Sequence, residues 1–277
     1  VYVSPGYTST DMGDKRKYAY QTDYFLTHDN NDQHLTLALE TEQESHNSTT
    51  MDTRSVVTEY GINFSDTYHI NAAARYDHNS LFKDAATSHV NVSSWLSDAW
   101  RLHTSMGEGI KNPTTVELFG YGLTYSGNVN LRPEENFTWD LGAEYSFEYL
   151  EGYIDATVFH SRIDSLISSY GSSAINLTSA AQIQGIELSL VASPPGNALK
   201  LTGSYTYTDT DDGTGQALTR RPAHMASLSA IYQYSDKTSI TSGVSYRGSR
   251  DDQDWVTCPS SGCRVTLPGY TLTNIAA

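Results

Sequence analysis

Apolar and polar side chains alternate along most of this chain, and the alternation is clearest in residues 137–147. The apolar positions there are Trp139, Leu141, Ala143, Tyr145 and Phe147, with polar or small residues between them. Successive side chains of a β-strand point to opposite faces, so the segment predicts a strand with one apolar and one polar face. Such strands occur in soluble sheets with one buried face, and in transmembrane barrels with lipid outside and water inside.

The same alternation recurs along the chain, and we count about thirteen such segments of roughly 9–13 residues, with no convincing helix between them. Strands of soluble sheets average about 5–6 residues, whereas a tilted membrane strand needs about 9–11. The lengths therefore favour membrane strands. The apolar positions of three further segments are Ile70, Ala72, Ala74 and Tyr76, then Leu199, Leu201, Tyr205 and Tyr207, then Ala226, Leu228, Ala230, Tyr232 and Tyr234.

The connections between these segments alternate between short and long. Tight turns are expected around residues 66–67, 98, 149–152, 194–198 and 236–238, and longer polar loops around 44–52, 78–87, 110–135, 165–179, 211–221 and 250–269. A soluble sandwich has no reason to sort its loops in this way, whereas outer-membrane barrels have short periplasmic turns and long external loops. We therefore predict an all-β fold, an antiparallel transmembrane β-barrel fragment.

Composition narrows the possible partners. The formal net charge of −15 argues against nucleic acid, because phosphate binding needs a basic protein face. No run of 18 apolar residues is present, so we expect no transmembrane helix; a barrel remains possible because its apolar residues alternate with polar ones. Many of the 20 tyrosines fall near predicted strand ends, where an interfacial aromatic girdle would place them.

Cys258 and Cys263 are the two cysteines of the chain and lie in the loop sequence CPSSGC. They lack the CxxC spacing and the neighbouring ligands of a metal site. We predict a short disulfide, worth on the order of 2–3 kcal/mol in the chain-entropy model, that stiffens one loop tip.

The sequence offers little for catalysis. Nine histidines are present, but neither a G-x-S-x-G nor an H-E-x-x-H motif occurs. His69, His103 and His160 fall within predicted strands, where a lumenal or girdle position explains them more simply than catalysis. We expect no enzyme, no catalytic residue, no cofactor and no bound metal.

Two segments, GEGIKNPTTVELFG and GNVNLRPEENFTWDLGAEY, resemble the hallmark region of TonB-dependent outer-membrane receptors. That family commonly shows a Gly-Phe-Arg-Ala-Pro-like run, a Glu-Leu, and then Gly-Asn-Pro-x-Leu-x-Pro-Glu before a strand. Ile110, Lys111 and Asn112 stand where Phe-Arg-Ala is usual, and Val129 replaces a proline. The matching residues are Gly109, Pro113, Glu117, Leu118, Gly127, Asn128, Leu131, Pro133 and Glu134.

The resemblance is collinear over nearly the whole chain. Gly185 and Glu187 match the family's Gly-x-Glu strand, and residues 199–232 are similar to its Tyr-Thr-Tyr strand and Arg-Arg-Pro loop. It implies a barrel of about 22 strands around a plug domain. Residues 1–277 would then be a partial barrel domain, without the plug, the TonB box, the first strands and the last strands.

The function implied is active uptake of a scarce metal chelate, a ferric siderophore or cobalamin, in the outer membrane of a Gram-negative bacterium. The implied partners are outer-membrane lipid, the chelate, and the TonB complex through the missing N-terminal part. Haem receptors that share the hallmark segments tend to carry a histidine between them, and residues 110–130 contain none, so the resemblance disfavours haem. Expected ligand contacts in the long loops are Phe119, Tyr121, Tyr125, Tyr170, Arg220, Arg221 and Trp255.

Two other functions remain open from the residues alone. A passive porin shares the alternating strands, and the conductance of the reconstituted full-length protein would distinguish it. An adhesin or phage-binding surface protein shares the long loops, but it would not explain the matching segments.

Overall fold

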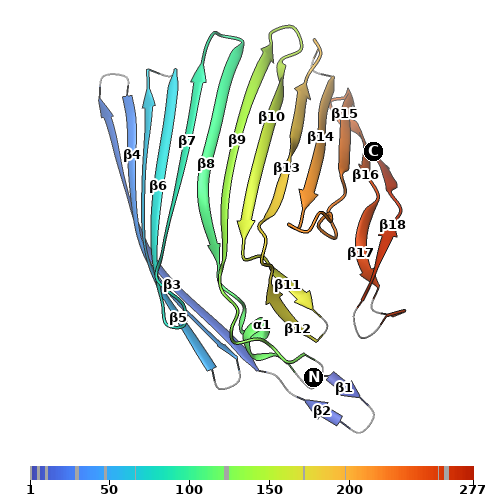
Figure 1. Ribbon diagram of the computed structural model, residues 1–277. Helices are drawn as coiled ribbons and strands as arrows, with labels where there is room; N and C mark the ends of the chain where they lie inside the picture. The colour runs from blue at the N-terminus through green and yellow to red at the C-terminus, as the bar shows by residue number, and fades with distance from the viewer. Residues whose placement is uncertain are drawn as a thin grey trace.

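Thirteen antiparallel strands form one curved sheet, in which nearly every strand pairs with its neighbours in the sequence (Figure 1). The computed structural model describes residues 2–4, 7–9, 12–28, 31–46, 49–65, 67–121, 125–170, 172–196, 198–254, 256–258 and 262–277. The expectation of about thirteen strands is confirmed. The strands are β3 (Gly13–His28), β4 (Asn31–His46), β5 (Thr49–Phe64), β6 (Tyr68–Asn79), β7 (Ala85–Trp95), β8 (Trp100–Lys111), β9 (Glu134–Phe147), β10 (Gly152–Asp164), β13 (Ala181–Ala192), β14 (Leu199–Asp211), β15 (His224–Ser235), β16 (Thr238–Arg247) and β19 (Tyr270–Ala276).

Smaller elements gather at one end of the sheet, the lower end in Figure 1. They are the two-stranded sheets β1 (Tyr2–Ser4) with β2 (Tyr7–Ser9), β11 (Ile167–Tyr170) with β12 (Ser173–Asn176), and β17 (Arg250–Asp254) with β18 (Cys263–Leu267), and the helix α1 (Thr115–Phe119). The opposite end carries short connections such as residues 96–99 and 148–151. Among the described residues, no helix is long and apolar enough to span a membrane.

Several expectations about local structure are wrong. The predicted loops at 165–179 and 250–269 contain the hairpins β11–β12 and β17–β18. The chain does contain a helix: α1 is one turn, and a capping box between Thr114 and Glu117 stabilises its start. The predicted loop at 44–52 is instead mostly strand, because β4 and β5 stay paired as far as His46 and Thr49. Met51 is the one apolar residue in this segment, so the segment lacks the apolar alternation that marks the other strands.

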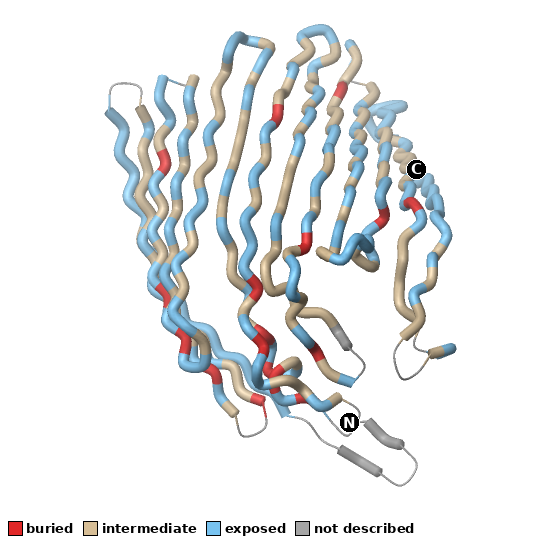
Figure 2. Tube along the Cα trace, in the orientation of Figure 1, coloured by how far each residue is buried: buried red, intermediate tan, exposed pale blue. Residues whose placement is uncertain are grey.

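The two faces of the sheet differ as the alternation predicts. On β9, Trp139 and Leu141 are 39% and 52% exposed, and their neighbours Asp140 and Gly142 are more enclosed. Buried residues are few, and several of them cluster near α1 (Figure 2). The described chain therefore resembles a sheet with an apolar outer surface rather than a globule around a core.

Candidate functional site

The long connection between β8 and β9 crosses the polar face of the sheet. Its Thr115 hydroxyl donates to Glu44 Oε1 at 3.0 Å, and His46 Nε2 lies 3.2 Å from the Gly120 carbonyl oxygen. Both partners are on β4, which β5, β6 and β7 separate from β8 in the sheet. A loop that reaches so far across a curved sheet follows its concave side, so the polar face is the concave one. We call residues 112–121 and 125–133 the arch.

Local backbone contacts fold the arch on itself. The Glu117 carboxylate accepts from the Thr114 N–H at 2.8 Å, and the Asn128 N–H donates to the Glu117 carbonyl at 2.7 Å. Gly127 has a left-handed φ of 57°, and a Cβ there would lie 2.3 Å from the Gly120 nitrogen. Only glycine allows this close approach of the two described segments of the arch.

The arch is joined to the hairpin β11–β12 by polar contacts. Asn128 Nδ2 donates to the Ala174 carbonyl at 2.9 Å, and the Arg132 N–H donates to Asn176 Oδ1 at 2.8 Å. The Ser173 hydroxyl donates to the Gly127 carbonyl at 3.0 Å. Two loops that are distant in sequence thus form one unit.

Apolar burial strengthens the same unit. Leu118 and Leu131 are each 4% exposed and pack with Ala174, which is 2% exposed. We call this the mouth cluster; its partly buried members are Phe82, Tyr125 and Ile167. Phe82 brings the connection between β6 and β7 into the cluster, so three loops meet at this end of the sheet.

The hallmark residues build this scaffold. Pro113 is fully buried, and Glu134 is 8% exposed. Glu134 Oε1 accepts from Lys111 Nζ at 3.1 Å and from the Ile167 N–H at 2.9 Å. Around Gly109, in contrast, a Cβ would meet no atom within 4 Å. Most of the predicted motif residues therefore hold the loops in place.

Three of the expected ligand residues lie together on the arch. Phe119 and Tyr121 are 38% and 49% exposed. The Tyr121 and Tyr125 rings stack with centroids 5.5 Å apart and an angle of 15° between their planes. Burial, and then the charge of Glu117, raises the pKa of Tyr125. The arch thus presents neutral aromatic surface at the mouth.

The other expected ligand residues belong to different loops. Arg220 Nε donates to Asp252 Oδ1 at 2.8 Å, and Arg221 is exposed. Trp255 and the side chain of Tyr170 lie outside the described residues. The structure thus brings together Phe119, Tyr121 and Tyr125 and places Arg220 in a separate set of contacts.

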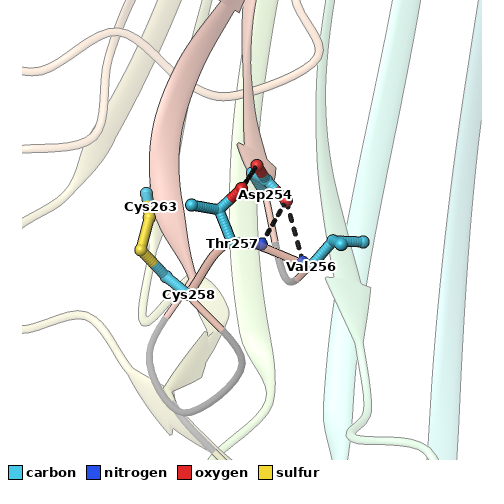
Figure 3. Close-up of a disulfide and its surroundings, with 5 residues drawn as sticks. All are labelled: Asp254, Val256, Thr257, Cys258 and Cys263. Carbon is cyan, nitrogen blue, oxygen red and sulfur yellow. Dashed lines mark hydrogen bonds between the residues drawn. A yellow bond between two sulfur atoms is a disulfide. The ribbon is translucent and has the colours of Figure 1, made fainter.

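The cysteines are joined by a disulfide, with Cα atoms 5.5 Å apart (Figure 3). Beside it the Asp254 carboxylate accepts from the Val256 N–H at 2.8 Å, from the Thr257 N–H at 3.0 Å and from the Thr257 hydroxyl at 2.6 Å. The hydroxyl contact is the main cause of the lowered pKa of Asp254. The turn before the disulfide is therefore held by side-chain hydrogen bonds.

Polar side chains also pair across the concave face. Arg75 reaches Glu40 at 2.8 Å and Asp77 at 2.9 Å, and His103 Nε2 lies 2.7 Å from Asp155 Oδ2. The alternation of the strands places all of these residues at polar positions, but it does not show which of them pair. In the part of the chain that the structure describes, no group of three or more His, Cys, Asp or Glu could hold a metal ion.

Comparison with known proteins finds one matching family model and a related transporter. A family model described as TonB dependent receptor-like, beta-barrel matches residues 3–277. The vitamin B12 transporter BtuB of Photobacterium profundum is 27% identical over 214 residues, which are 74% of this chain and 33% of that protein.

Solved structures share the fold. A mutant of the ferric enterobactin receptor PfeA from Pseudomonas aeruginosa matches with a TM-score of 0.78 and 19% identity, over 95% of this chain and 46% of that one. The siderophore receptor PirA from Acinetobacter baumannii matches with a TM-score of 0.79 and 15% identity, over 96% and 48%. The chain thus spans between a third and a half of the length of these relatives.

Proposed function

The chain belongs to the TonB-dependent receptor family, as part of its β-barrel, and on this premise we propose that the whole protein actively takes up a metal chelate. The proposed chelate is cobalamin or a ferric siderophore. Support comes from the relatives, which include a vitamin B12 transporter and siderophore receptors. The proposed location is the Gram-negative outer membrane, with the apolar outer surface of the sheet against lipid.

The arch is the main structural support for this proposal. The hallmark segment forms a rigid arch across the concave face, and it presents aromatic side chains at the mouth of the sheet. Binding residues are commonly found on loops that a rigid scaffold positions. We therefore propose Phe119, Tyr121 and Tyr125 as contacts for the ligand.

The other expected ligand contacts lie outside the arch. Tyr170 and Arg221 keep that role, because β11 and the connection between β14 and β15 lie at the same end of the sheet as the arch. Trp255, which lies outside the described residues, keeps it from the sequence alone. We assign Arg220 to the architecture of the loops instead, because its guanidinium is held by Asp252. Energy coupling would pass through TonB and a plug domain, in parts of the protein beyond residues 1–277.

Growth tests this proposal. A strain without the full-length gene should fail to grow when one particular chelate, either a ferric siderophore or cobalamin, limits growth, and the restored gene should rescue it. Growth that is equal with and without the gene on every cobalamin and siderophore tested would contradict the proposal.

A passive porin is the rival function, because a polar concave face would also suit an open water-filled channel. Planar-bilayer conductance of the full-length protein separates the two. A plugged transporter should give no steady current, whereas a stable open conductance would favour the porin.

A further inference from the structure

A second group of loops is joined by one arginine. Arg264, on β18, donates from Nε to Asp251 Oδ2 of β17 at 2.9 Å. Its Nη1 donates to Gln216 Oε1 at 3.0 Å and its Nη2 to the Ala217 carbonyl at 2.6 Å. Gln216 and Ala217 lie in the connection between β14 and β15, residues 212–223. One guanidinium therefore ties the hairpin β17–β18 to a different loop.

A second arginine, in residues 212–223, connects that loop back to the hairpin β17–β18. Arg220, in residues 212–223, donates from Nε to Asp252 Oδ1 at 2.8 Å and from its backbone N–H to the Asp251 carbonyl at 2.6 Å. The two carboxylate side chains are only 28% and 23% exposed. Their arginine partners differ, because Arg264 is 33% exposed and Arg220 is 66% exposed. The Arg264–Asp251 pair is therefore the better shielded from water and the stronger of the two. We call residues 212–223, 250–254 and 263–267 the clasp.

Among the described residues, the hairpin β17–β18 is joined to the rest of the chain by these contacts and by Arg250, whose guanidinium lies over the Tyr270 ring of β19 at 5.9 Å from its centroid. It is a separate two-stranded sheet of five residues a side, not an extension of the thirteen-stranded sheet. A two-stranded hairpin alone is marginally stable in water. The disulfide closes the hairpin where Asp254 pairs with Cys263, and Arg264 is the next residue along the chain. The disulfide is therefore attached to the first residue of β18, directly before Arg264.

We propose that the clasp is locked by the Cys258–Cys263 disulfide and that reducing this bond releases both loops together. A dithiol such as dithiothreitol supplies the electrons: its thiolates break the S–S bond, both cysteines become thiols, and the dithiol becomes a cyclic disulfide. Arg264 then loses its fixed position, so Gln216 and Ala217 lose their partner although neither is near the cysteines in sequence.

Limited proteolysis of the purified full-length protein tests the proposal. Trypsin cleavage after Arg220, followed by mass spectrometry, reports opening of the loop that carries no cysteine. Reduction should speed this cleavage by about tenfold, because proteolysis follows the population of the opened state. Cys258→Ser with Cys263→Ser should give the same increase without reductant, and Asp251→Asn should give an increase with the disulfide intact.

Arg162→Gln is the matched control, because Arg162 pairs at 2.8 Å with Asp164 on its own strand and joins no loops. It should leave cleavage after Arg220 unchanged. Free-thiol labelling confirms reduction, and circular dichroism confirms that the sheet persists. Once reduction has been verified, two results would refute the proposal that the disulfide locks the clasp. One is faster cleavage after Arg264 alone, which would mean that the disulfide acts locally, and the other is unchanged cleavage at both sites. Reduction of the unaltered protein decides the question even if a variant misfolds.

Discussion

The arch with its partner hairpin β11–β12 and the clasp both join loops at the same end of the sheet, but different interactions order them. The arch has a buried apolar cluster, a buried Glu134 and a glycine where no Cβ fits. The clasp has partly exposed ion pairs and a disulfide. Apolar burial does not depend on redox state and is not screened by salt, whereas exposed charge pairs respond to pH and are screened by salt. We infer that the arch is a permanent part of the mouth and that the clasp is conditional.

The largest effect should come from Gly127→Ala. The left-handed φ alone costs about 1–2 kcal/mol, and the close approach to Gly120 adds to it. Hydrogen exchange in residues 114–131 should rise by at least about tenfold, and ligand affinity should fall with it. Gly109→Ala is the control: it lies in the same hallmark segment with open space at its Cβ, and it should change neither. Equal effects of the two substitutions would mean that the arch does not depend on this close contact.

Glu134→Ala should be next in size. It removes the acceptor of Lys111 Nζ and of the Ile167 N–H in a buried place. The expected loss is about 1–3 kcal/mol, measured as faster exchange in both the arch and β11. The neighbouring Glu135 is exposed, so Glu135→Ala should stay close to the unaltered protein. If hydrogen exchange increased in the arch alone, Glu134 would not be needed to hold β11 in place.

Tyr121→Ala should weaken ligand binding without loosening the arch. An aromatic contact between Tyr121 and the ligand is worth about 0.5–1.5 kcal/mol, so its loss corresponds to a roughly 2–10-fold weaker affinity. Titration of the full-length protein with its chelate measures this effect. Tyr149→Ala, on an exposed turn at the opposite end of the sheet, is the control. An unchanged affinity for Tyr121→Ala would remove this ring from the proposed site.

Lowering the pH should open the clasp but not the arch, and this should be the smallest of the four predicted effects. The Thr266 hydroxyl and then the Arg264 guanidinium lower the pKa of Asp251, and the Arg220 guanidinium lowers the pKa of Asp252. Carboxylates with lowered pKa values stabilise fully above their unfolded pKa of about 3.9, and that stability is lost as pH falls through the folded value.

Exchange in the clasp, corrected for intrinsic rates, should therefore be constant from about pH 8 to 5 and rise below about pH 4. Asp251→Asn should remove most of this rise. A transition near pH 6 would instead point to a histidine and contradict the assignment.

The sheet could be predicted from sequence because its signal is repeated. Each strand alternates for longer than a soluble strand needs, and Leu141 and Asp140 show the two faces directly. The hallmark residues were also found, but their role was not, because a motif does not show that Leu131 meets Ala174 of another loop.

Neither the alternation of the strands nor the hallmark motif predicts which residues contact each other across the concave face. The contacts from Thr115 to Glu44 and from Arg264 to Gln216 join residues that only the curvature of the sheet and the folding of the loops bring together. Helix α1 was detectable in principle, since Thr114 and Glu117 have the spacing of a capping box.

The most direct test of the proposed function is accumulation of labelled chelate by cells that express the full-length protein, with and without a working TonB system. We predict accumulation above the outside concentration in TonB-proficient cells, and surface binding without accumulation in TonB-deficient cells. Equal accumulation in both would contradict energised uptake and favour a passive channel.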